Sequence, residues 1–93
     1  MKSVQEAPLA HYVREYSALP GLQQAHRVEY TLRRSDTMLC FSARRSSEAA
    51  PVNYYTAALE EVPACRLLCY LYENSIGPEQ LRDVLSDFCG RTL

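Results

Sequence analysis

The chain has 93 residues, of which 47% are apolar and 23% are charged, and its net charge at pH 7 is −1. A chain of this length fits one small domain, which buries roughly 60–65% of its unfolded surface and leaves little material for a deep catalytic cleft. The charge is uneven: residues 27–45 carry five arginines against two acids, and residues 46–93 carry seven acids against three arginines. No part of the chain is basic enough to favour nucleic-acid binding strongly.

The N-terminal part of the chain predicts a hairpin. We expect residues 1–8 to form a flexible N-terminus and residues 9–93 to form a single domain. Residues 9–17 fit both a helical stripe and a strand. We favour the strand, because the Pro20-Gly21 turn separates this segment from a clearer strand at hairpin distance.

The clearer strand covers residues 27–33, where apolar and polar side chains alternate. A turn over residues 34–36 leads into a second strand over residues 37–44, which should pair antiparallel with the first. A polar connection then leads to a further strand over residues 52–59, rich in tyrosine and threonine. The side chains predicted to face the core are those of Val28, Tyr30, Leu32, Leu39, Phe41 and Ala43.

From Val62 onward the apolar period becomes that of a helix. Pro63 suits the first helical position, Gly77 suits the end of this helix, and Pro78 suits the start of a second one. The predicted core stripes are Cys65, Leu68, Cys69, Tyr72 and Ile76, widened by Leu67 and Leu71, and then Leu81, Val84, Leu85, Phe88 and Cys89, closed by Gly90. Strands followed by helices predict an α+β fold, with an antiparallel meander of three or four strands packed against a C-terminal two-helix hairpin.

Cysteines lie within both helical stripes. Cys65 and Cys69 are one helical turn apart and would supply two metal ligands if others converged on them. Packing is the favoured interpretation, because a free cysteine in an apolar stripe behaves as a small hydrophobe, and a thiol-based metal or redox site is the alternative. No apolar run approaches the ~20 residues that span a bilayer, and MKSVQEAPLA lacks the apolar block of a signal peptide. We therefore expect a cytoplasmic protein with reduced thiols, no membrane contact and no cofactor.

Four arginines flank the second predicted strand: Arg33, Arg34, Arg44 and Arg45. The favoured interpretation is a solvated face that protects a strand edge, and contact with an anion or a nucleic acid is the alternative. A DNA-reading helix-turn-helix is disfavoured, because the helical segment is acidic.

The chain carries no GxSxG, phosphate-binding glycine loop or HExxH motif, so we predict no catalytic activity. Seven tyrosines instead favour an interaction surface, because tyrosine combines a large contact area with a polar tip. Tyr54 and Tyr55 are adjacent, so in a strand one faces inward and the other outward. The candidate surface residues are Tyr30, Tyr54, Tyr55, Asp83 and Asp87, and the expected partner is a second copy or another protein.

The strand EYTL and the later segment NSIGPEQLRDVLSDF together resemble a group of short uncharacterised bacterial proteins, chiefly clostridial, that form a domain family of unknown function. The residues that match the C-terminal pattern of this family are Pro78, Leu81, Asp83, Val84 and Asp87. Leu39-Cys40-Phe41 stands where the family has a Tyr-Gly-Ile-like element. The resemblance covers about residues 27–89. It implies the α+β fold, and it implies no activity, cofactor or catalytic residue.

Overall fold

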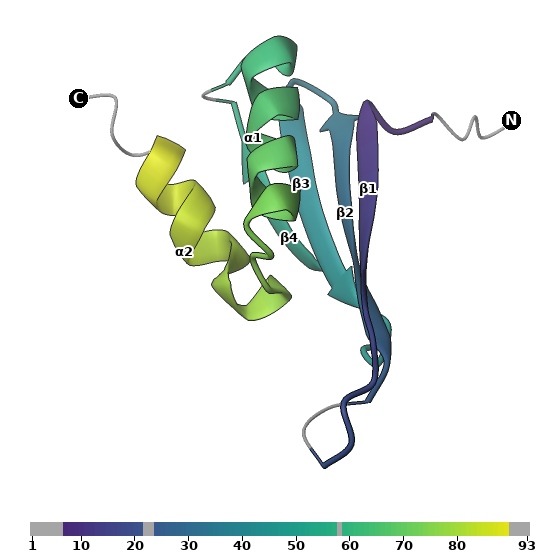
Figure 1. The fold of residues 1–93 in the computed structure, drawn as a ribbon. Coiled ribbons are helices and arrows are strands. Elements are labelled where there is room, and N and C mark those ends of the chain that lie inside the picture. Colours follow the sequence, from purple (N-terminus) through teal and green to yellow (C-terminus); the bar gives the residue numbers. More distant parts are fainter. Residues whose placement is uncertain (1–6, 22–23, 58, 90–93) are drawn as a thin grey trace, which may run out of the picture.

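The computed structural model describes residues 7–21, 24–57 and 59–89. In this part of the chain a four-stranded antiparallel sheet is followed by two helices, which confirms the predicted α+β fold (Figure 1). The elements are β1 (Ala10–Tyr16), β2 (His26–Ser35), β3 (Met38–Arg45), β4 (Val52–Thr56), α1 (Glu61–Glu73) and α2 (Pro78–Cys89). The strands lie in the sheet in chain order, so every strand pairs with its neighbours in the sequence. Residues 1–6 of the predicted flexible end and Gly90 lie outside the described residues.

The first hairpin confirms the strand interpretation of residues 9–17, because β1 pairs with β2 over its whole length. The turn predicted over residues 34–36 lies further along the chain. Ser35 pairs with Met38, which leaves Asp36 and Thr37 as the two loop residues. Asp36 has a φ of 55°, in the left-handed region that a two-residue hairpin requires and that aspartate tolerates. The fourth strand is shorter than predicted, since β4 ends at Thr56.

The core lies between one face of the sheet and the two helices. α1 packs on β2 and β1, and α2 packs on β4 and β3, so both helices cover the same face (Figure 1). All six strand residues predicted to face the core are buried there, and Tyr30, Leu32, Phe41 and Ala43 are 0% exposed. The opposite face of the sheet carries no helix in the described part of the chain.

The buried stripe of α1 differs from the predicted one by about one residue. Its buried side chains are Ala64, Leu67, Leu68 and Leu71, whereas Cys65 and Cys69 are only half-buried. The physical reason is the position of α1 over β1 and β2, which directs its smallest apolar residue, Ala64, at the sheet. The two thiols therefore lie at the margin of the stripe.

Both predicted helix boundaries around Pro63 and Gly77 need correction. α1 begins at Glu61, so Pro63 is its third residue, still within the first turn, where a backbone N–H has no helical partner. Gly77 does not end α1, because that helix stops at Glu73. Gly77 instead precedes α2, where its N–H donates to Oε1 of Gln80 at 3.1 Å, in the manner of a capping box.

Two long side chains from the sheet hold the connection between the helices. The buried Tyr30 donates its hydroxyl to the Ile76 carbonyl at 2.7 Å, and Arg14 Nε donates to the Tyr72 carbonyl at 2.9 Å. The Arg14 guanidinium also lies 4.9 Å from the centre of the Tyr72 ring. Burial raises the pKa of Tyr30 to about 12. The Tyr72 carbonyl lies in the last turn of α1 and also accepts from the Ser75 N–H, whereas the Ile76 carbonyl lies in the connection between the helices.

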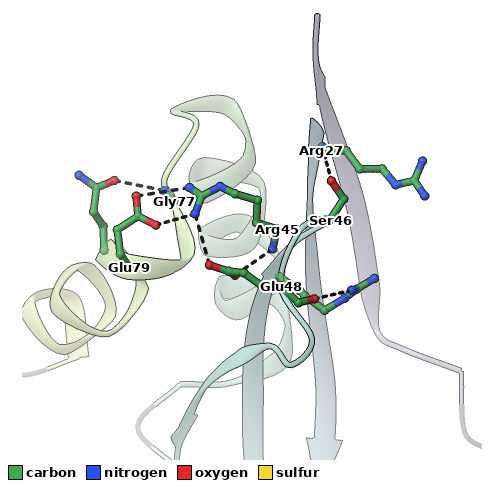
Figure 2. A network of polar contacts seen from close by, with 8 residues as sticks. Arg27, Arg45, Ser46, Glu48, Gly77 and Glu79 are labelled. Carbon is green, nitrogen blue, oxygen red and sulfur yellow. Dashed lines mark hydrogen bonds and ion pairs between the residues drawn. The ribbon is translucent and has the colours of Figure 1, made fainter. Parts of the chain in front are cut away.

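A polar network joins the end of β3 to the start of α2 (Figure 2). Arg45 lies between two carboxylates, with Nη1 at 3.1 Å from Glu79 Oε1 and 3.5 Å from Glu48 Oε2. The hydrogen bond and charge of Arg45 lower the pKa of Glu79, and Glu79 raises the pKa of Arg45. The network fixes the first turn of α2 against the sheet.

We expect Glu79→Gln to lower the free energy of unfolding by less than about 1 kcal/mol at pH 7, because Glu79 is 63% exposed and solvent screens the ion pair. A lowered pKa means that this contribution is present above the usual pKa of the carboxyl and is lost as the pH falls through the folded-state value. Urea unfolding of both proteins at pH 7 and pH 3 measures the effect, which should shrink at pH 3. Asp83→Asn, on the exposed face of α2, is the matched control. It should leave the free energy of unfolding unchanged at both pH 7 and pH 3.

Candidate functional site

An apolar groove lies between the start of α1 and the end of α2. The helices pack on different strands, and in Figure 1 they diverge from their joint toward the C-terminal end of α2. The groove has a volume of about 400 Å³ and is lined by Leu59, Pro63, Arg66, Leu67, Tyr70 and Phe88. Arg66 is the only residue in this lining that carries a formal charge.

Two exposed aromatic rings bridge the groove. Tyr70 of α1 and Phe88 of α2 are 41% and 43% exposed, and their ring centres lie 5.4 Å apart at an interplanar angle of 71°. Phe88 was predicted to be a core residue, and that prediction is wrong. Leu81 and Leu85 supply the buried contacts of α2, while Phe88 reaches toward Tyr70 and leaves much of its ring in solvent.

The apolar surface continues around the beginning of α1. A second cavity of about 460 Å³ shares Leu59 and Pro63 with the groove and also borders Val62, which is 63% exposed. This cavity is more polar, and the ion pair between Arg34 and Glu61 lies beside it. The most apolar part of this surface is therefore the groove between the helices.

The structure separates the five residues predicted to form an interaction surface. Tyr30 is completely buried in the core, so its assignment to a surface is wrong. Tyr54 and Tyr55 face opposite sides of the sheet as predicted, because Tyr54 packs against the core and Tyr55 is 52% exposed on the open face. Asp83 and Asp87 lie on the exposed side of α2. None of the five lines the groove.

Most of the strand tyrosines do not lie on the open face of the sheet. In the described strands, the pairing places Tyr12, Tyr16, Tyr30 and Tyr54 on the face that the helices cover. Tyr55 alone among the strand tyrosines lies on the open face. The strand tyrosines therefore do not gather into an interaction surface on the open face of the sheet.

Three of the four flanking arginines are held by nearby acids. Arg34 pairs with Glu61, Arg44 Nη2 lies 3.2 Å from Glu29 Oε1, and Arg45 contacts Glu48 and Glu79. Arg33 is exposed on the open face of the sheet. Because strand alternation sends neighbouring arginines to opposite faces, the four do not form one basic patch.

Three of the four thiols lie beside tyrosine hydroxyls. None of the four cysteines, all within the described residues, forms a disulfide. A hydrogen bond with the Cys69 thiol raises the pKa of Tyr12, and a hydrogen bond with Cys40 raises the pKa of Tyr55. Burial, followed by the Cys89 thiol, raises the pKa of Tyr54. Among the residues that the structure describes, no three or more His, Cys, Asp or Glu side chains gather so as to hold a metal ion.

Sequence reasoning missed the groove and the cavity beside it, although one signal for this surface was present. Val62, Arg66 and Tyr70 recur at i, i+4 and i+8, on the side of α1 away from its most buried residues. Val62 and Tyr70 are large apolar side chains on the solvent-exposed side of an amphipathic helix, and such side chains indicate a contact surface.

Comparisons with protein-family models, with curated proteins and with solved structures found no match to this chain. The resemblance to the clostridial family of unknown function therefore stays a prediction. In the described part of the chain, neither helix has the length and apolar character needed to cross a bilayer.

Proposed function

We propose that this protein is a non-catalytic protein-interaction domain that binds an apolar segment of a partner in the groove between α1 and α2. The observation that carries this proposal is the exposed Tyr70–Phe88 pair in the apolar lining of the groove. Aromatic anchors in apolar pockets supply much of the affinity at protein interfaces. Exposed apolar surface with polar groups at its margin is also typical of such sites.

The charge of the lining defines the chemistry of the partner. Arg66 is exposed at the groove, and its guanidinium suits two hydrogen bonds to a carboxylate. The ligand is therefore an apolar segment that also carries an acidic side chain. An amphipathic helix laid between two helices is a common arrangement for binding of this kind.

Selection of a phage-displayed peptide library on the full-length protein tests the proposal. We expect the selected peptides to combine large apolar residues with Asp or Glu. Phe88→Ala should weaken their binding about five- to thirtyfold, because loss of an aromatic anchor typically costs about 1–2 kcal/mol or more. Arg66→Glu should weaken binding of the acidic peptides most. Isothermal titration calorimetry of synthetic peptides gives the dissociation constants.

Met38→Ala is the matched control, since Met38 is an exposed apolar residue of β3 that does not line the groove. It should leave peptide binding unchanged. Peptides that bind wild type and Phe88→Ala equally well would show that the groove is not the binding site.

A further inference from the structure

The edge strand β1 presents a second, independent contact surface. β1 is the outermost strand of the sheet and pairs only with β2 among the described residues (Figure 1). Its pairing runs without a bulge from Ala10 to Tyr16, and its sequence AHYVREY contains no proline, glycine or lysine. Lysine, proline and bulges are among the features by which proteins protect exposed edges, because an unprotected edge pairs readily with another strand. The other edge strand, β4, has five residues and follows Pro51.

We propose that β1 pairs antiparallel with β1 of a second copy of this chain, about a two-fold axis at Val13, to form a continuous eight-stranded sheet. The residues that this register places opposite one another support the pairing. It is independent of the groove, which lies between the helices.

The two-fold axis stands perpendicular to the sheet, so each residue meets a partner on its own face. With Val13 on the axis, all seven residues of β1 are paired. Glu15 then lies opposite His11 of the second copy, and Arg14 lies opposite Tyr12 of the second copy. Each of these contacts occurs twice, because the axis repeats it.

The neighbouring registers are less favourable. An axis at Arg14 pairs only five residues of each strand and sets two guanidinium groups directly opposite each other. An axis at Tyr12 also pairs five residues, and it places Arg14 opposite Ala10. The register centred on Val13 therefore has the greatest overlap, and it sets no like charges directly opposite each other.

The side chains of β1 are already arranged for this contact. Tyr12 stacks on Tyr72 with ring centres 5.1 Å apart, and Arg14 of the same chain lies over that Tyr72 ring. Arg14 of the second copy would approach the same aromatic group through Tyr12, where a guanidinium is attracted to the ring face. On the open face, His11 Nε2 lies 3.7 Å from Glu29, and Glu15 of the second copy joins this pair.

Sedimentation equilibrium of the full chain over a wide concentration range tests the proposal. A contact of two seven-residue strands is small beside the standard interface of about 800 Å² per partner, so we expect a reversible, concentration-dependent dimer. Val13→Lys should raise its dissociation constant about tenfold or more, because two lysines would meet on the axis. Within one chain Val13 lies opposite Glu29, so this variant should stay folded, as circular dichroism would show.

Tyr55→Lys places the same charge on the open face at the opposite edge of the sheet, and it should leave dimerisation unchanged. Oxidative cross-linking locates the contact directly. Val13→Cys should give a dimer joined through the two introduced thiols, identified by mass spectrometry, whereas Tyr55→Cys should not. A wild-type chain that stays monomeric at its highest soluble concentration would overturn the proposal. Cross-linking through Tyr55→Cys but not Val13→Cys would do so as well.

Discussion

Replacing Phe41 with alanine should lower the free energy of unfolding by about 3–5 kcal/mol. Phe41 is 0% exposed at the centre of the covered face, where it lies between Leu32 of β2 and Tyr54 of β4. Removing its ring leaves a cavity that the sheet cannot close, because three paired strands fix the surrounding backbone. A domain with a net stability of about 5–15 kcal/mol would lose a large fraction of it. Urea unfolding followed by circular dichroism measures the change.

Phe88→Ala is the control for this prediction, because it deletes the same atoms from a side chain that is 43% exposed. Its expected cost is about 1 kcal/mol, since less apolar surface returns to water and no enclosed cavity forms. The chain has only two phenylalanines, so the pair separates a core residue from a surface residue within one molecule. Equal losses of stability in the two variants would contradict these assignments.

Raising the pH from 10 to 12 should remove about 2 kcal/mol of stability through Tyr30 alone. Its pKa is about 12 in the folded protein, against the usual value of 10 in the unfolded chain. A raised pKa means that the folded state holds the proton more tightly. The contribution is therefore complete below pH 10 and is lost as the pH rises through the folded-state value. Urea unfolding at a series of pH values from 8 to 12 measures the decline.

Tyr30→Phe separates titration from packing. This variant loses the hydrogen bond to the Ile76 carbonyl, which should cost about 1 kcal/mol at pH 8. Its stability should then fall less steeply above pH 10 than that of the wild type. A smaller slope should remain, because Tyr12 and Tyr54 also have raised pKa values. Identical slopes in the two proteins would rule out Tyr30 as the main titrating group.

The faces of the strands could be predicted from the sequence because alternation has a period of two and one face is buried. Val28 and Phe41 were placed in the core on that basis, and the structure confirms both. The position of the turn could not be predicted in the same way. Arg34 continues β2 and forms an ion pair with Glu61 of α1, and a contact across 27 residues leaves no local signal.

Helical periodicity alone does not determine which side chains of α1 and α2 are buried. Stripes that begin at Ala64 and at Cys65 fit the same helical spacing, and only the position of α1 over the sheet selects the first. The groove depends further on how far α2 diverges from α1. Phe88 has the spacing of a core residue, yet that divergence leaves it beside Tyr70 and in solvent. The candidate site is thus a property of tertiary packing.

The chain-order arrangement of the strands has a consequence for how the molecule folds. Every strand pair joins neighbours in the sequence, so each hairpin closes only a short loop and loses little chain entropy. The sheet can therefore assemble one hairpin at a time. The hydrogen bonds from Arg14 to Tyr72 and from Tyr30 to Ile76 join residues that are far apart in the sequence. They form only when the helices dock on the sheet. Docking of α1 and α2 on a sheet that is already paired is the step expected to limit the folding rate.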